Sequence, residues 1–143
     1  MTQLSTIQDC YKITLSRSID NRGSLAFVQE DRQVPFKIKR VFWLYDIPSD
    51  ATRGGHSLKD CSQVLIALSG CFNVVVHDGK HTENYPLSRA YEGLFIPSLI
   101  WREINGFATN SICLVVASEY FDEQSYCRTY EEFINHRKKM LNI

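Results

Sequence analysis

The feature that most constrains this chain is a series of short apolar or alternating runs separated by turn residues. The runs cover residues 24–29, 39–45, 63–68, 72–77, 93–96 and 111–118, and Gly, Pro, Asn or Asp bounds them. Runs of this kind are typical of β-strands. Asp78-Gly79 predicts a tight hairpin, because both residues tolerate the positive φ angles of such turns. With eight or more strands expected in 143 residues, an all-β barrel or jelly roll is favoured, since closure removes free sheet edges.

Only the C-terminal end of the chain has helical spacing, from about residue 122 to residue 141. The apolar residues that share one face there are Tyr126, Tyr130, Phe133 and Ile134. Lys138 and Lys139 lie near the C-terminal end, where cations complement a helix dipole. The sequence therefore predicts one amphipathic helix after the barrel.

Length and charge narrow the class of protein. A chain of 143 residues is expected to form one domain, residues 1–143. Its 16 basic residues balance 16 acidic ones, so we expect neither nucleic acid nor an anionic membrane as a partner. The N-terminus does not resemble a signal peptide, which predicts a cytoplasmic location. The five cysteines include no C-x-x-C pair, so we expect neither a disulfide framework nor a zinc knuckle.

Two short motifs match the sequence frame of small barrels of the cupin type. The first consists of Gly55-His56-Ser57-Leu58, Gln63 and Gly70, and the second of Gly93, Pro97 and Trp101-Arg102. A metal-binding cupin places three histidines and one carboxylate in this frame, whereas this chain offers His56, Leu58, Gln63 and Arg102. An apolar side chain and a permanent cation are poor ligands for a divalent metal. The sequence therefore predicts a metal-free site without a cofactor.

One histidine and several arginines in a barrel mouth suit a particular chemistry. Histidine can transfer a proton near neutral pH, and guanidinium groups bind phosphate or a developing oxyanion with paired donors. A phosphorylated or nucleotide-linked substrate with an acidic C–H bond fits this combination.

Several segments, in register from about residue 12 to residue 134, resemble the dTDP-4-keto-6-deoxyhexose 3,4-ketoisomerases, the WxcM-like cupins. These segments are Asp20-x-Arg22-Gly23-x-Leu25, Pro35-Phe36-x-Ile38-Lys39-Arg40-Val41, Arg53-Gly54-Gly55-His56, residues 63–70, Ile96-Pro97 with Trp101-Arg102, and Ala117-Ser118-x-Tyr120-x-Asp122-Glu123. The resemblance implies a homodimer of cupin barrels that exchange N-terminal strands. It also implies a role in making 3-amino-3,6-dideoxyhexoses for bacterial surface glycans.

The same resemblance implies roles for individual residues. The family reaction moves a carbonyl from C4 to C3 of the nucleotide-linked sugar through an enediol. His56 is the candidate general base, and the expected substrate-binding residues are Arg40, Arg102, Arg22, Arg53, Gln63 and Tyr45. Trp43, Tyr45 or Trp101 is expected to pack on the thymine or the sugar.

Two departures from the family pattern leave alternatives open. Leu58 replaces a second histidine, and Phe42 stands where a tyrosine is frequent. Either His56 suffices with Tyr45 or water assisting, or the protein is an isomerase or epimerase for another dTDP-sugar. A third reading is a non-catalytic protein that binds nucleotide sugars.

Overall fold

The computed structural model describes residues 4–141, and β-strands dominate it. The strands are β1 (Tyr11–Thr14), β2 (Arg17–Asp20), β3 (Gly23–Ala26), β4 (Arg40–Leu44), β5 (Arg53–Leu58), β6 (Gln63–Ser69), β7 (Phe72–His77), β8 (Thr82–Leu87), β9 (Glu92–Ile96), β10 (Trp101–Asn105), β11 (Ile112–Ala117) and β12 (Tyr126–Cys127). The helices are the short 3-10 turns η1 (Ile7–Asp9) and η2 (Glu123–Ser125) and the α-helix α1 (Tyr130–Leu141). The expected domain, residues 1–143, extends beyond the described residues at both ends.

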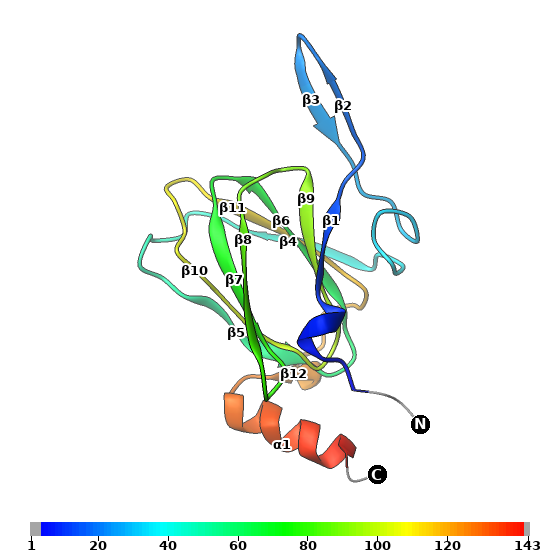
Figure 1. The fold of residues 1–143 in the computed structure, drawn as a ribbon, viewed down its shortest axis with the longest axis vertical. Helices are drawn as coiled ribbons and strands as arrows, with labels where there is room; N and C mark the ends of the chain where they lie inside the picture. The colour runs from blue at the N-terminus through cyan, green and yellow to red at the C-terminus, as the bar shows by residue number, and fades with distance from the viewer. Residues whose placement is uncertain (1–3, 142–143) are drawn as a thin grey trace.

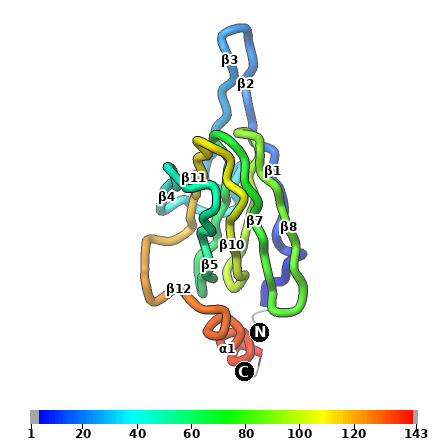
Figure 2. The backbone as a smooth tube through the Cα atoms, turned by 90° about the vertical axis from the view of Figure 1, so that its left-hand side faces the viewer, coloured from blue at the N-terminus to red at the C-terminus, as the bar shows by residue number. Residues whose placement is uncertain are grey.

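Ten of the strands form two five-stranded sheets that enclose the core. The strand order is β1-β9-β6-β11-β4 in one sheet and β12-β5-β10-β7-β8 in the other, and every pairing within them is antiparallel. The core contains Leu65 and Val115 from the first sheet and Val74 and Ile104 from the second. Side chains from both sheets therefore meet between them. Figures 1 and 2 show the arrangement of the strands, and the predicted all-β, cupin-like fold is confirmed.

The β2–β3 hairpin stands apart from both sheets. It forms a two-stranded sheet of its own and projects from one end of the barrel (Figure 1). All eight of its strand residues are exposed, including Ile19 and Leu25. An isolated hairpin is at best marginally stable in water. This arm therefore lacks the packing that would normally hold such a pair of strands.

The predicted turn at Asp78-Gly79 is present, and the predicted helix is shorter than expected. Residues 72–77 pair with residues 82–87, and the Asp78 amide donates to the His81 carbonyl at 3.2 Å. The helix begins at Tyr130 rather than near residue 122. Tyr126 has the spacing of the helical face but belongs to β12, because its backbone pairs with β5 opposite Leu58. Within residues 4–141, no helix is long and apolar enough to cross a membrane.

Candidate functional site

His56 lies in β5, where two glycines bring its strand close to β10. Gly54 and Gly55 have φ angles of 81° and 64°, which favour glycine. A Cβ on Gly54 would lie 3.1 Å from the Arg102 carbonyl oxygen, so a larger residue would push the strands apart. The Arg53-Gly54-Gly55-His56 segment therefore allows a close β5–β10 contact directly before the histidine.

The half-buried His56 ring has one nitrogen engaged and one available. Its Nδ1 lies 3.1 Å from the Gly54 carbonyl oxygen. Because a carbonyl oxygen can only accept, this hydrogen bond places the proton on Nδ1 and leaves the Nε2 lone pair free. Burial and the cations Arg102, Arg128 and Arg40 together lower the pKa of His56 to about 3, and the Gly54 hydrogen bond offsets part of this shift. The site therefore holds a neutral, oriented imidazole at neutral pH.

Arg102 is the buried cation beside this histidine. It lies opposite His56 in the β10–β5 register, and 1% of it is exposed. Its Nη1 donates to Gln63 Oε1 at 2.7 Å, and its Nη2 donates to the Ile100 carbonyl at 3.2 Å. Within residues 4–141 no carboxylate forms an ion pair with it, and burial lowers its pKa to about 10. A buried charge without a counter-charge is costly unless a ligand supplies one.

Gln63 and Arg40 add further unpaired donors. Gln63, from β6, is 3% exposed, and its buried Nε2 has no hydrogen-bond partner among the described residues. The buried Nε of Arg40 likewise has none. The Arg40 guanidinium lies over the rings of Phe42, at 5.1 Å, and Phe121, at 5.6 Å. Unpartnered donors beside a buried cation suit an oxygen-rich anionic ligand.

Leu58 occupies the place where the family pattern has a second histidine. It is 1% exposed and packs with Cys61, Ala117 and Tyr126. The leucine side chain itself has no polar atom, so this position contributes packing and no proton transfer. Within residues 4–141, no three His, Cys, Asp or Glu residues come together in a way that could hold a metal ion. The donors around His56 do not fit a metal, because Arg102 and Leu58 cannot ligate one.

Three of the expected substrate-binding residues lie away from this group. Arg22 is at the tip of the β2–β3 hairpin, where its exposed guanidinium pairs with Asp20 at 2.7 Å. Arg53 is exposed at the start of β5. Tyr45 follows the edge strand β4 and is 61% exposed. The described residues of one chain thus bring together His56, Arg102, Gln63 and Arg40, but not these three.

The two tryptophans also lie apart from His56. Trp101 packs against Tyr130 and Phe133 of α1, with ring centroids 5.5 and 5.9 Å away, on the outer face of its sheet. Trp43 is 56% exposed on β4. Among the described residues, the ring that packs on His56 is that of Tyr126 and not that of either tryptophan.

Tyr126 is a neighbour of His56, although its sequence spacing predicts a place on the helix. Its ring lies against that of His56, with centroids 5.0 Å apart and planes inclined by 56°. The Arg128 guanidinium lies 4.2 Å from the centre of the Tyr126 ring. Two hydrogen bonds, of 2.8 and 2.7 Å, hold Arg128 on Glu123. The sequence gives only a weak indication of strand β12, namely the short segment between Asp122, which caps the 3-10 turn η2, and the helix α1.

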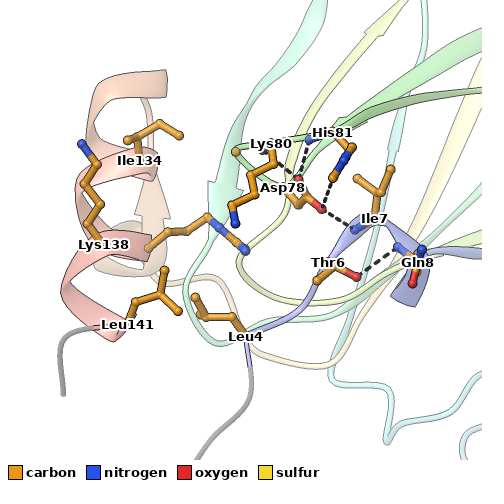
Figure 3. A pocket seen from close by; sticks show the side chains of 12 residues that line it. Leu4, Thr6, Ile7, Gln8, Asp78, Lys80, His81, Ile134, Lys138 and Leu141 are labelled. Atoms are coloured by element: carbon orange, nitrogen blue, oxygen red, sulfur yellow. Dashed lines mark hydrogen bonds and ion pairs between the residues drawn. The ribbon is translucent and has the colours of Figure 1, made fainter.

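A cavity of about 730 Å³ lies elsewhere, between the N-terminal segment, the β7–β8 turn and α1 (Figure 3). Asp78 accepts a hydrogen bond from the Ile7 amide at 3.1 Å, and Arg137 donates to the carbonyls of Ser5 and Leu99 at 2.9 and 2.7 Å. These bonds tie the N-terminal segment and the helix to the barrel. None of the expected site residues lines this cavity, so it is separate from the site around His56.

The chain is similar to known proteins over most of its length. The family described as "FdtA: WxcM-like, C-terminal" matches residues 8–138. A TDP-4-oxo-6-deoxy-alpha-D-glucose-3,4-oxoisomerase from Aneurinibacillus thermoaerophilus is 36% identical over 121 residues, which are 85% of this chain and 87% of that protein.

Solved structures agree with this similarity. The WlaRB TDP-quinovose 3,4-ketoisomerase from Campylobacter jejuni is 39% identical, with a TM-score of 0.86 over 90% of this chain and 99% of that one. The 3,4-ketoisomerase QdtA from Thermoanaerobacterium thermosaccharolyticum is 35% identical, with a TM-score of 0.88 over 91% of this chain and 94% of that one. That structure is of a histidine-to-asparagine mutant in complex with TDP-4-keto-6-deoxyglucose.

Proposed function

Because the chain belongs to the FdtA, WxcM-like family, we propose that it is a 3,4-ketoisomerase acting on dTDP-4-keto-6-deoxyglucose and forming a dTDP-3-keto-6-deoxyhexose. One observation in the structure supports this function most directly. A neutral imidazole with a free Nε2 faces a buried arginine that has no carboxylate partner among the described residues. The site therefore has a general base beside a buried positive charge that can bind an oxyanion.

The reaction follows from this pairing. The C4 ketone acidifies the proton on C3, and His56 Nε2 removes it to give an enediolate. Arg102 and the unpaired amide of Gln63 are suited to bind the developing oxygen charge, because donors that are already oriented need no reorganisation. Protonation at C4 then gives the 3-ketosugar, and no metal is needed for any of these steps.

The low pKa of His56 belongs to the site without its anionic substrate. The field of Arg102, Arg128 and Arg40 disfavours the imidazolium. Burial is the largest cause of the low pKa, and a nucleotide diphosphate near these arginines would offset the part that is due to their field and so raise the pKa of His56. Substrate binding would therefore strengthen the base where it is needed, and Arg40 is the arginine best placed for the diphosphate.

The test is to incubate the protein with dTDP-4-keto-6-deoxyglucose in deuterated buffer and to follow C3 and C4 by proton NMR. The proposed function predicts a new 3-keto species and deuterium at the exchanging carbon. TDP binding without exchange would instead favour the non-catalytic binding protein. A change at C5 would favour the epimerase, an alternative that relatives of 35–39% identity do not support.

Leu58 stands where the family pattern has a second histidine. Replacing Leu58 with histidine tests whether the loss of that histidine has slowed proton transfer. The new imidazole would be buried among Cys61, Ala117 and Tyr126, where only the Tyr126 hydroxyl and the Cys61 thiol are polar. We expect unfolding in urea to show a loss of about 1–3 kcal/mol and kcat not to rise. The control Leu58→Met keeps the volume and is expected to cost less than about 1.5 kcal/mol. A marked rise in kcat for Leu58→His would show that the loss of the second histidine had slowed proton transfer.

The protein is further proposed to be a cytoplasmic homodimer with exchanged N-terminal strands, each chain forming one domain over residues 1–143. The β2–β3 hairpin exposes Ile19 and Leu25, and the free edge strand β4 exposes Trp43 at 56%. Strand β4 has an unpaired edge, and the β2–β3 hairpin has no packing partner among the described residues. Exchange of N-terminal strands between two copies would cover both. The exchange would also carry Arg22 away from its own barrel and towards the partner's.

Trp43→Glu tests this dimer. Aromatic side chains at the centre of an interface often contribute about 2 kcal/mol or more, so the substitution is expected to weaken association more than about tenfold. Sedimentation velocity over a concentration series measures this change. The control is Leu141→Glu on α1, an equally apolar residue that is 69% exposed. A wild-type protein that stays monomeric at high micromolar concentration would contradict the proposed dimer.

A further inference from the structure

Among the tyrosines of the chain, Tyr126 is set apart by its contact with the candidate base. The sequence contains seven tyrosines. Tyr11 packs on Phe95, Tyr85 bonds to the Cys10 carbonyl, Tyr91 lies beneath Arg17, Tyr130 packs on Trp101, and Tyr45 and Tyr120 are 61% and 73% exposed. Tyr126 is the one whose ring lies against His56, at 5.0 Å. Tyr45, expected to assist, makes no such contact within residues 4–141.

The strand register places the Tyr126 side chain on the same face as the other site residues. Tyr126 lies opposite Leu58 in the β12–β5 pair, and Arg102 lies opposite His56 in the β10–β5 pair. Residues opposite one another share a face, and residues two apart on a strand share it too. Tyr126, Leu58, His56 and Arg102 therefore all belong to the face that contacts the barrel interior.

The surroundings of the Tyr126 phenol suit a group that exchanges a proton. Its hydroxyl makes no hydrogen bond to the described residues, whereas Tyr85 donates to a backbone carbonyl. The Arg128 guanidinium lies over its ring at 4.2 Å. The phenol is close enough to Arg102 and Arg128 to raise the pKa of both guanidinium groups by a Coulombic interaction. The hydroxyl therefore lies beside two positive charges and has no competing hydrogen bond among the described residues.

The reaction under "Proposed function", on which this inference rests, requires a second proton carrier. His56 moves a proton between two carbons, but O4 must also gain a proton and O3 must lose one. Phe42 has no hydroxyl, and Leu58 is buried among apolar groups. We propose that Tyr126 carries the proton between the two sugar oxygens while His56 carries the proton between the two carbons.

The two transfers balance. His56 Nε2 takes the C3 proton, the C–H electron pair forms the C3–C4 double bond, and the carbonyl π pair moves to O4, which takes the Tyr126 phenol proton. The phenolate then takes the proton from the O3 hydroxyl, whose electron pair forms the C3 carbonyl. The C3–C4 π pair takes the proton from His56 at C4. Both side chains return to their starting states, and no external oxidant or reductant is used.

Tyr126→Phe is the decisive variant, because it removes the hydroxyl and keeps the ring that packs on His56 and beneath Arg128. General acid–base groups typically contribute about 10²- to 10⁴-fold, so kcat is expected to fall at least about 100-fold. KM, TDP affinity measured by calorimetry and the melting temperature are expected to stay close to wild type. The matched control is Tyr120→Phe, whose exposed hydroxyl lies outside the site, and it is expected to leave kcat unchanged.

Other outcomes overturn the assignment. A Tyr126→Phe variant with kcat within about threefold of wild type shows that the hydroxyl carries no proton, given the magnitudes of acid–base catalysis. A parallel loss of TDP affinity and turnover makes Tyr126 a binding residue instead. The wild-type protein is assayed beside the variants, so failure of the proposed function appears as absent wild-type turnover. Failure of the Tyr126 assignment appears only in the ratio of variant to wild type.

Discussion

Replacing His56 with asparagine is expected to lower kcat by about 10²- to 10⁴-fold, the range that a positioned general base contributes. The asparagine amide can still donate to the Gly54 carbonyl, which His56 Nδ1 contacts at 3.1 Å. It has no basic nitrogen to replace Nε2, so the proton on C3 stays in place. Proton NMR in deuterated buffer is expected to show neither a 3-keto product nor deuterium at C3.

The binding of TDP separates this result from a folding defect. Arg102 and Arg40 keep their charges in the variant, so TDP affinity measured by calorimetry is expected to change less than about threefold, since no ion pair to phosphate is removed. His81→Asn is the matched control, because this histidine lies in the β7–β8 turn with 72% of its side chain exposed. Retention of more than a tenth of wild-type turnover by His56→Asn would assign the base to another residue.

Acid stability supplies an independent view of the same histidine. The unfolded chain takes up a proton on this histidine near pH 6.5, whereas burial holds the folded pKa at about 3. Between these values the unfolded state binds more protons, so the contribution of His56 to stability is present above pH 6.5 and is lost as the pH falls towards 3. The neutral form required of a base is thus also the form that the fold favours.

Four of the six runs that predict strands lie in strands of the buried core, whereas residues 24–29 overlap the exposed β3 and residues 39–45 the edge strand β4. The runs at 63–68, 72–77 and 111–118 became β6, β7 and β11, which supply Leu65, Val74 and Val115 to the core. Strand β8, Thr82–Leu87, gave no signal, because it is mostly polar and contains a proline. It is an edge strand, where a missing backbone donor is tolerated. Apolar or alternating runs identify a strand only where it carries enough apolar residues, and β8 carries too few.

The error at the C-terminus has a different physical cause. Tyr126 precedes Tyr130 by four residues and so imitates one face of a helix. Its backbone instead completes a sheet through pairing with Leu58, 68 residues earlier, and local spacing carries no information on that pairing. The same fact explains why Tyr126 was not recognised as a neighbour of His56.

Candidate site residues that occupy motif positions lie together in the structure, whereas one whose placement depends on strand orientation lies apart. His56, Gln63 and Arg102 come from motif positions, and hydrogen bonds or register join them in the structure. Tyr45 is turned outward, because the alternation of β4 places Phe42 and Leu44 against the core. A shift of one residue reverses every side chain on a strand, and composition does not determine that choice.

Arg102→Gln is expected to lower kcat about 100-fold and to raise the pKa of His56 from about 3 towards its ordinary value of 6.5. The first effect follows because the guanidinium is the buried donor best placed for the enediolate oxygen. The second follows because Arg102 is the leading charge that lowers the His56 pKa after burial itself. Turnover assays measure the first effect, and proton NMR titration of the histidine ring resonances measures the second. The His56 resonance is identified by its absence from His56→Asn.

The free energy of unfolding of Arg102→Gln shows whether Arg102 mainly stabilises the fold or mainly serves the reaction. Hydrogen bonds from Arg102 to Gln63 and Ile100 are lost, at about 1.5–3 kcal/mol each. The burial of a charge with no carboxylate partner among the described residues is relieved, which returns several kcal/mol. We therefore expect the free energy of unfolding in urea to change by less than about 2 kcal/mol, since these two contributions oppose each other.

Arg128→Gln is the matched control for the charge of Arg102. Arg128 also lowers the pKa of His56, but its side chain is 49% exposed and paired with Glu123, so solvent screens its field. We expect it to shift the His56 titration less than Arg102→Gln does, because its exposed charge is screened. An unchanged His56 titration in Arg102→Gln, or full turnover, would mean that the buried arginine serves packing alone. A large fall in kcat with the fold intact would place its positive charge at the reacting oxygen.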